Sequence, residues 1–408
     1  MQAAPVQDTL APASLISIFT IFLKLGFTSF GGPIAHIGYF RHEFVEKRNW
    51  LDDNSYADLV ALCNFLPGPA SSQIGMALGI SQRGLQGALA AWLGFTMPSA
   101  LALIGFAYGF TAFGIASDAG WLHGLKIVAV AVIAQAIWGM GKNLCPDRSR
   151  ATLAIVATLI VFLWPTAWGQ IFAILIGGII GWRYFEPVAL HSPENVKFPL
   201  SKTVAVVAWV LFFGLLFGLP SLATVVENNT LSIFDSFYRT GSLVFGGGHV
   251  VLPLLHNEVV PPGWVRDDVF LAGYGAAQAV PGPLFTFAAY LGTINAVEPK
   301  GFTGGMLALV AIFLPSFLLV AGALPYWDAL RQKKHVQSAL RGVNAAVVGL
   351  LLAALYNPVW TTSIQDTGDM ALALIAFGLL MFWKLSPVYV VAVTAVGGAV
   401  LATFPVLF

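Results

Sequence analysis

An internal repeat runs through the chain. Phe30-Gly31-Gly32 recurs as Phe245-Gly246-Gly247, 215 positions later (246 − 31), and Pro67-Gly68-Pro69 recurs as Pro281-Gly282-Pro283 at almost the same spacing. A duplicated apolar chain whose glycine and proline motifs fall at matched positions is typical of membrane transporters, in which the substrate site lies between the two repeats. The fold therefore has to bring two related halves together around these motifs.

Other residues match between the halves at the same or nearly the same spacing. The matched pairs are Lys24 with Arg239, Glu43 with Glu258, Asp52-Asp53 with Asp267-Asp268, Trp50 with Trp264, Pro98-Ser99 with Pro315-Ser316, and Lys126 with Arg341. We predict a first repeat over residues 1–185, a linker with one extra membrane helix over residues 186–230, and a second repeat over residues 231–408.

The composition indicates a membrane protein. Hydrophobic residues form 58% of the chain and charged residues only 10%, with a mean hydropathy of +0.80. A soluble protein needs more charge than this to cover its surface. We predict an all-α polytopic membrane protein with two homologous halves and about 10–13 membrane segments, some of them re-entrant or broken by Gly and Pro. The apolar spans are 14–34, 55–80, 86–113, 121–141, 151–165 and 167–184, then 201–219 as the extra span, then 232–252, 268–295, 303–325, 337–357, 369–383 and 386–405. The sequence leaves open whether the Pro-Gly-Pro segments cross or re-enter, and the short pairs around Trp164-Pro165 and Ser386-Pro387 could be hairpins.

The positions of Lys and Arg bear on the orientation of the halves. Clusters of basic residues surround Arg148, Lys202 and Lys333. If these clusters face the cytoplasm, as the positive-inside rule requires, and each span crosses once, the halves form an inverted-topology repeat. Lys47 and Arg48 then fall on the outer side, which counts against this assignment.

Two kinds of break interrupt the apolar spans. Two glycines before Pro33 do not continue a regular helix, and the backbone groups that they free must be buried in protein or line a wet cavity. Each Pro-Gly-Pro motif is suited to opening a half-helix inside the membrane, and Ser71 and Ser72 follow it in the first half. The free N–H groups and the positive dipole end of a half-helix form a ready anion site.

Lys24 and Arg239 add positive charge near these breaks. Each lies seven residues before its glycine pair, about two helical turns, and an isolated charge within a span costs at least ~2.5–3.5 kcal/mol. The predicted substrate-binding residues are Lys24, Gly31, Gly32, Pro67, Gly68, Pro69, Ser71, Ser72, Arg239, Gly246, Gly247, Pro281, Gly282 and Pro283. A structural interpretation stays open, because paired glycines also permit close helix packing and a lone lysine can snorkel to the interface.

The sequence offers little support for an enzyme or for a bound cofactor. It contains no HExxH motif, Ser71 and Ser72 have no adjacent histidine, and Cys63 and Cys145 lack metal-ligand or redox spacing. The net charge of +1 does not indicate nucleic acid as a partner. We expect no metal and no cofactor, and the lipid bilayer as the surroundings. The sequence leaves open whether the protein is a monomer or a homodimer.

The motifs resemble those of the chromate ion transporter family in its long, two-domain form. The resemblance rests on FGGPIAHIGYFRHEFVEKRNW and NFLPGPASSQIGMALG in the first half, and on FGGGHVVLPLLHNEVV and AQAVPGPLFTFAAYLG in the second. It implies export of chromate across the bacterial inner membrane, driven by the proton-motive force, with the sulfate-like oxyanions as related ligands. The alternatives are a sulfate or oxyanion exchanger, an uptake carrier and a passive anion channel.

The resemblance also suggests which side chains exchange protons. His36, Glu43, His249 and Glu258 lie beside the glycine breaks and are the proton-coupling candidates. The alternative is that the histidines are interfacial residues and that the glutamates only pair with nearby basic side chains.

Overall fold

The computed structural model describes residues 13–30, 32–112, 119–186, 198–245, 248–327 and 333–403, and all regular structure within these ranges is helical. The helices of the first repeat are α1 (Leu15–Thr28), α2 (Gly32–Phe40), η1 (Arg41–Lys47), α3 (Asp53–Phe65), α4 (Ala70–Ala112), α5 (Gly120–Leu144), α6 (Arg148–Leu163) and α7 (Ala167–Tyr184). After α8 (Lys202–Val226), the second repeat contains α9 (Asn229–Leu243), η2 (Gly248–Val250), α10 (Val251–Val259), α11 (Asp267–Gln278), η3 (Leu284–Thr286), α12 (Phe287–Ile294), α13 (Gly301–Ala323), η4 (Leu324–Tyr326), α15 (Lys334–Ala354), η5 (Leu355–Trp360), α16 (Thr361–Ser363), α17 (Thr367–Met381) and α18 (Pro387–Thr403).

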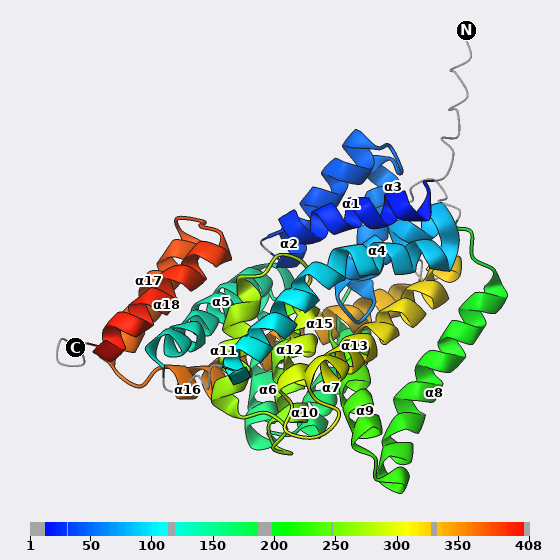
Figure 1. Ribbon diagram of the computed structural model, residues 1–408. Helices are drawn as coiled ribbons and strands as arrows, with labels where there is room; N and C mark the ends of the chain where they lie inside the picture. Colours follow the sequence, from blue (N-terminus) through cyan, green and yellow to red (C-terminus); the bar gives the residue numbers. More distant parts are fainter. Residues whose placement is uncertain are drawn as a thin grey trace.

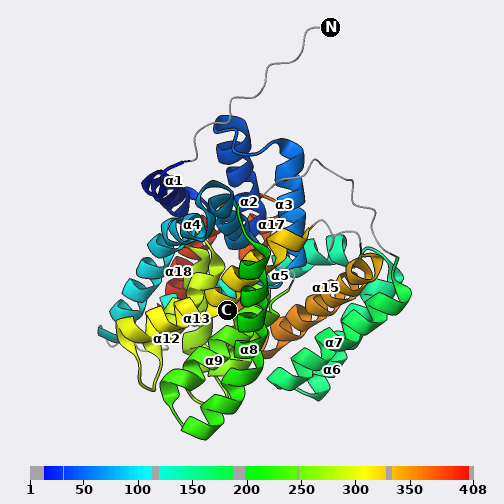
Figure 2. The ribbon, with the colours of Figure 1, turned by 90° about the vertical axis from the view of Figure 1, so that its right-hand side faces the viewer.

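The predicted all-α membrane fold is confirmed. Five helical segments of the described chain are long and apolar enough to cross a bilayer, namely Ala70–Phe110, Gly120–Leu144, Lys202–Val226, Gly301–Tyr326 and His335–Ser363. The extra helix α8 runs along one flank of the molecule (Figures 1 and 2). Between Val204 and Pro220 its exposed side chains are apolar, and Phe217 is 70% exposed. Such a surface belongs in lipid.

Local polar residues fix where several helices begin. Asp52 caps α3, because its side chain accepts a hydrogen bond from the N–H of Ser55. In the second repeat the capping position is Arg266, and Asp267 and Asp268 lie in the first turn of α11, where carboxylates favour the positive end of the helix dipole. The matched Asp pairs therefore act differently, since one caps its helix and the other lies inside the first turn.

The first apolar segment of each repeat folds back on itself at its glycine break. Phe22 of α1 stacks on Phe44 of η1, with ring centroids 4.9 Å apart. In the second repeat Arg239 of α9 bonds Glu258 of α10 at 2.7 Å. A continuous helix would hold residues 19 positions apart about 28 Å from each other. The assumption that 14–34 and 232–252 each cross the membrane once is therefore wrong, because the chain reverses between α1 and η1 and between α9 and α10 and forms a hairpin in each repeat.

The second apolar segment of each repeat is also a hairpin, and it turns at Pro-Gly-Pro. The hydroxyl of Tyr290 in α12 donates to the carbonyl of Val269 in α11 at 3.1 Å. Beyond the ends of this hairpin, the N–H of Ala296 donates to the carbonyl of Trp264 at 2.9 Å, so both ends lie at one level. The segment 268–295 is therefore re-entrant, a point that the sequence left open.

The corresponding hairpin of the first repeat joins α3 to the beginning of α4. At Arg83 and Gly84 the backbone of α4 leaves helical geometry, and Gly79 packs directly against Gly87. In a straight helix these glycines would be about 12 Å apart, so the chain reverses here too. Arg83 Nε donates to the carbonyl of Ala13 at 2.9 Å, which brings the end of this hairpin to the beginning of α1. The span predicted at 55–80 is thus also a hairpin.

The hairpins of the two repeats open at opposite ends of the molecule. After the reversal at Gly84, α4 runs to Tyr108, whose hydroxyl accepts from the N–H of Phe302 beside the second-repeat hairpins. These 24 residues span about 36 Å, close to the ~30 Å of a bilayer core. Figures 1 and 2 show α1 to α3 at the top of the view and α9 at the bottom.

The last helices of each repeat pack against a helix of the other repeat. Gly124 of α5 packs against the backbone of Thr394 in α18, whereas Gly177 of α7 packs against the backbone of Gly342 in α15. Small residues at both crossings allow the helices this close approach. Each repeat therefore lays its last helical pair, α6–α7 or α17–α18, against a helix of the other repeat.

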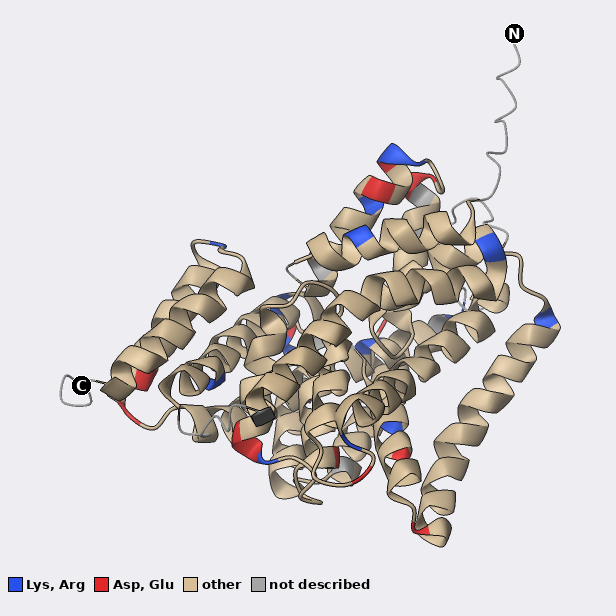
Figure 3. Ribbon diagram, viewed as in Figure 1, with Lys and Arg blue, Asp and Glu red and all other residues tan. Residues whose placement is uncertain are grey.

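Basic residues gather at one end of the molecule. Figure 3 shows Lys and Arg around the loop before α3 at the top of the view, where Asp and Glu also lie, at the turn between α17 and α18, and at the beginning of α8 on the right. Following the crossing helices, Lys47, Arg48, Arg83 and Lys142 also lie at this end. The opposite end, where the second-repeat hairpins open, carries Arg266 and Lys300 with several carboxylates.

Candidate functional site

The tips of the hairpins meet inside the molecule. The N–H of Gly68 in the first Pro-Gly-Pro turn donates to the carbonyl of Val244 at 2.6 Å, just before the second glycine break. The N–H of Gly282 in the second Pro-Gly-Pro turn donates to the carbonyl of Ser29 at 2.9 Å, just before the first glycine break. Ser29 and Val244 are themselves matched positions of the repeat. Each turn therefore docks on the other repeat, as in a contact with two-fold symmetry.

A second reciprocal contact explains why both turns contain glycine. Gly68 and Gly282 have φ values of +119° and +98°, a backbone region that L side chains rarely adopt. A Cβ on Gly68 would lie 2.6 Å from Ser316 Oγ, and one on Gly282 would lie 3.0 Å from Ser99 Oγ. These serines belong to the matched Pro-Ser pairs of opposite repeats. The predicted residues Pro67, Pro69, Pro281 and Pro283 flank the two glycines and shape these turns.

Buried polar atoms without a partner surround the crossed tips. Among the described residues they include Ser29 Oγ, Ser72 Oγ, Gln73 Oε1 and Ser316 Oγ. Such atoms are rare in native interiors, because each costs about 1–3 kcal/mol when it is desolvated and unpaired. A cluster of them points to a ligand or to ordered water. Hydroxyl groups can donate to an oxyanion without adding a fixed positive charge.

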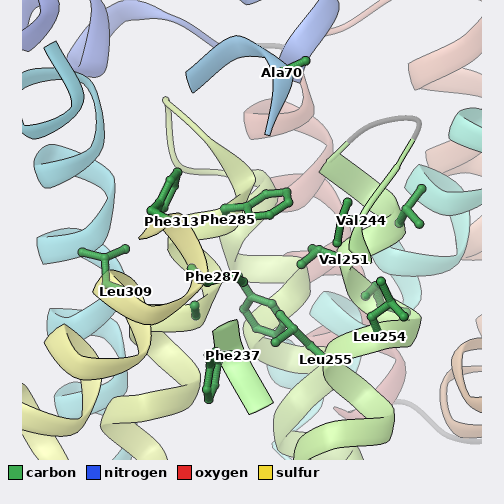
Figure 4. Close-up of a cluster of buried hydrophobic side chains, with 14 of the residues drawn as sticks. Ala70, Phe237, Val244, Val251, Leu254, Leu255, Phe285, Phe287, Leu309 and Phe313 are labelled. Atoms are coloured by element: carbon green, nitrogen blue, oxygen red, sulfur yellow. The ribbon is translucent and has the colours of Figure 1, made fainter. Parts of the chain in front are cut away.

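The helix that starts at the first tip adds backbone donors. The helix α4 begins at Ala70 directly after Pro69, as the sequence predicts, and its first internal bond runs from the N–H of Gln73 to the carbonyl of Pro69. In the second repeat, a short 3-10 turn η3 precedes α12. Figure 4 shows that apolar side chains, including Phe285 and Phe313, pack below Ala70 in this region. The two halves thus differ at the tip.

His36 joins the first tip to the glycine break. Its Nε2 lies 3.1 Å from the carbonyl of Ser29, and its Nδ1 lies 3.2 Å from the hydroxyl of Ser71. The side chain is 1% exposed. With Nε2–H donating to the carbonyl, the neutral ring accepts at Nδ1 from the Ser71 hydroxyl. His36 therefore holds the first turn of α4 against the end of α1.

Arg239 is held by two carboxylates. Its Nη2 lies 2.7 Å from Glu258 and 3.2 Å from Asp235, while its Nε is buried without a partner. The matched residues of the first repeat behave differently. Lys24 is exposed on α1, and Glu43 is bound by Arg48 at 2.8 Å and by Lys47 at 3.4 Å. Lys24 and Arg239 are thus equivalent in sequence register only.

The carboxyl group of Glu43 lies in η1, outside the crossing helices. Burial works against its charged form, but the hydrogen bonds and charges of Arg48 and Lys47 outweigh burial and lower the pKa of Glu43. Glu43 therefore stays ionised at neutral pH.

The remaining predicted residues are placed as follows. His249 bonds the buried hydroxyl of Tyr274 through Nδ1 at 2.8 Å. Gly32 begins α2 with a φ of +74°. Gly31, Gly246 and Gly247 lie outside the described residues.

Sequence reasoning missed four polar residues near the tips: Ser29, Gln73, Asp235 and Ser316. Two of them carried a signal, because Ser316 belongs to a repeated Pro-Ser pair and Asp235 precedes Arg239 by one helical turn. Ser29 and Gln73 are ordinary polar residues in sequence, and only the crossing of the tips makes them notable.

Comparisons with known proteins agree with the duplicated architecture. A family model described as Chromate transporter matches residues 16–182 and 231–399. The Chromate transport protein of Pseudomonas aeruginosa is 30% identical over 97% of this chain and 94% of its own length. The Chromate transport protein of Cupriavidus metallidurans is 27% identical over 99% of this chain and 97% of its own. No solved structure matches.

A shorter relative is matched by one part of the chain. The Uncharacterized transporter YwrA of Bacillus subtilis is 36% identical over 42% of this chain and 97% of its own length. A protein of this kind is about as long as a single repeat.

Proposed function

The chain belongs to the chromate transporter family, and on that premise we propose that it exports chromate from the cytoplasm across the bacterial inner membrane. The observation that carries the proposal is the reciprocal docking of the hairpin tips, with Gly68 on Val244 and Gly282 on Ser29. Tips that meet inside a membrane protein, ringed by unpaired buried hydroxyls, provide a binding site shared by the two repeats.

The proposed site binds the anion mainly through neutral donors. The hydroxyls of Ser29, Ser72 and Ser316 would donate to the oxygens of the tetrahedral dianion, together with the first N–H groups of α4. His36 would keep Ser71 in place. The glycine N–H groups of the Pro-Gly-Pro turns already bond carbonyls of the other repeat, so we assign them to fastening the tips.

We propose an inverted repeat with the first-repeat hairpins open to the cytoplasm. The support comes from the basic residues, since Lys47, Arg48, Arg83 and Lys142 gather at that end, as the positive-inside rule requires. Because 14–34 is a hairpin, Lys47 and Arg48 lie on the cytoplasmic side in this arrangement. They therefore no longer count against the inverted repeat. Hairpins that enter from opposite faces could open the site to one side at a time.

The membrane potential would drive export. With the interior negative at 100 mV, moving two negative charges outward gains roughly 4.6 kcal/mol. We propose His36, His249 and Glu258 as the groups that exchange protons during the cycle, whereas Glu43 is held ionised by Arg48. The exposed charge of Lys24 would attract the anion as it approaches.

Everted membrane vesicles test the proposal, because export then appears as uptake. With an imposed potential, positive inside the vesicle, we expect vesicles that contain the protein to accumulate radioactive chromate with saturation. Adding excess sulfate measures how strongly this oxyanion competes with chromate for uptake. Vesicles that take up chromate no faster than vesicles without the protein would contradict the proposal. Uptake that sulfate abolishes at equal concentration would favour general oxyanion exchange.

A further inference from the structure

We propose that Asp235, Arg239 and Glu258 form a proton-binding site that takes up one proton when the anion binds. The three side chains are joined by Arg239 Nη2, which lies 2.7 Å from Glu258 and 3.2 Å from Asp235. Asp235 is 6% exposed, and Arg239 is 23% exposed as a side chain. This inference rests on the function proposed above and names the group that links protons to the anion.

The net negative charge of Asp235, Arg239 and Glu258 favours the binding of one proton. Two ionised carboxylates and one guanidinium leave a net charge of −1 in a largely buried site, which is costly where water is scarce. Among the described residues, the helices that pack on α9 offer no positive charge to compensate it. The helix α13 contains no ionisable residue apart from its capping Lys300, and α8 carries only Lys202 at its first position. On α10 the remaining titratable residue, His256, is engaged by Asp267 at 2.5 Å.

The trio is close enough to the hairpin tips to sense an anion there. Arg239 precedes Val244, the docking partner of Gly68, by five residues, or about 7.5 Å along a helix. Gly241 lies between them and packs on Ile312 of α13, one turn before Ser316. At about 10 Å and an intermediate dielectric, one unit charge changes the affinity for a dianion by roughly a hundredfold.

The sign of the coupling follows from these charges. The deprotonated trio, at −1, repels a dianion at the tips, whereas the protonated trio is neutral. Anion binding therefore favours proton binding and, by linkage, proton binding favours anion binding equally. Affinity for the dianion rises as pH falls.

The repeat provides an internal contrast. At the position of Asp235 the first repeat has Thr20 (235 − 215), and Glu43 there is neutralised by Arg48 and Lys47. The negative surplus therefore exists in the second repeat only. The proposal assigns one proton to the molecule, and not one to each half.

Chromate binding to the purified, full-length protein tests the site across a series of alkaline pH values, where chromate is a dianion. We expect the wild-type affinity to fall by up to about tenfold per pH unit, the limit for one linked proton. Asp235→Asn should bind with an affinity that barely changes with pH, and more tightly than wild type at the highest pH. Glu258→Gln removes the surplus through the other carboxylate and should give the same result.

Two controls keep the outcomes distinct. Asp147→Asn alters an exposed N-capping carboxylate and should retain the wild-type pH slope, as should Asp235→Glu. A wild-type slope in both Asp235→Asn and Glu258→Gln overturns the proton site. Wild-type binding that is independent of pH overturns it too, while leaving the transport proposal intact. Failure of the wild-type protein to bind chromate at any pH would instead contradict the proposed function itself.

Discussion

At the scale of single residues, the site is defined by polar atoms that lack partners. Ser72 Oγ, Ser29 Oγ and Ser316 Oγ are buried and unpaired, although Ser81 and Ser99, in the same helix as Ser72, each bond a carbonyl of the preceding turn. Nothing in helix formation requires these hydroxyls. An unpaired donor weakens the folded protein slightly and improves binding of a ligand that accepts from it.

Ser72→Ala separates these two effects. We expect unchanged or slightly higher thermal stability, because a buried unpaired hydroxyl is removed, and chromate affinity lower by roughly ten- to a hundredfold, because a donor to a charged ligand is lost. Thermal unfolding and chromate binding on the same sample provide the two readouts. Ser81→Ala is the matched control, since Ser81 Oγ already donates to the carbonyl of Leu78. Affinity unaltered in Ser72→Ala would remove this hydroxyl from the site.

At the scale of elements, the unit of this fold is a hairpin whose tip touches the other repeat. The tip works only with glycine, because the backbone at Gly68 and Gly282 is left-handed and the space for a Cβ is taken by Ser316 or Ser99. The two tips are not equally tight, since the second leaves more room. Replacing Gly68 should therefore lower the stability of the protein more than replacing Gly282.

Alanine substitutions at the tips test this ranking. Gly68→Ala adds a Cβ 2.6 Å from both Ser316 Oγ and Gln73 Nε2 and should lower stability by about 1–3 kcal/mol and abolish transport. Gly282→Ala, with its nearest contact at 3.0 Å, should cost less. Gly105→Ala in α4 meets nothing within 4 Å and should be neutral or slightly stabilising. Equal effects in all three proteins would show that docking of the tips is unimportant.

At the scale of the whole molecule, two related halves open toward opposite ends. The ends of the first-repeat hairpins gather at Ala13, and those of the second repeat gather at Trp264, about one bilayer thickness away along α4. The exchanged helical pairs, α6–α7 and α17–α18, tie the halves together. From the charge asymmetry of the ends we propose that the first end faces the cytoplasm.

Labelling of introduced cysteines tests this orientation. In a Cys145→Ser background, in which Cys63 remains buried, Lys300→Cys should react with a membrane-impermeant thiol reagent in spheroplasts, and Lys47→Cys should not. Everted vesicles should reverse the result. Labelling of both positions from the same face would refute the inverted arrangement, because it would place both sets of hairpin ends on one side.

Much of the fold and part of the site follow from the sequence. The repeat register, the membrane class and the helix breaks at Pro67-Gly68-Pro69 and Pro281-Gly282-Pro283 were all correctly predicted. That Lys24 and Arg239 bind the anion together stays a prediction. In the structure Arg239 pairs with Asp235 and Glu258. The repeat register shows that Lys24 and Arg239 are equivalent positions. It does not reveal that only Arg239 has a second carboxylate, Asp235, bound to it.

The sequence by itself determined that this chain lies in a membrane, that it consists of two related halves and where its helices break. These properties depend on local chemistry, namely apolar blocks, proline and glycine. Only the tertiary structure decided that the segments 14–34, 55–80, 232–252 and 268–295 are hairpins and that their tips meet across the repeats. An apolar segment of 20 to 30 residues satisfies lipid either as one long helix or as two short ones folded back, so hydropathy does not distinguish them. The choice depends on partners from the other half, such as Ser29 for Gly282 and Val244 for Gly68.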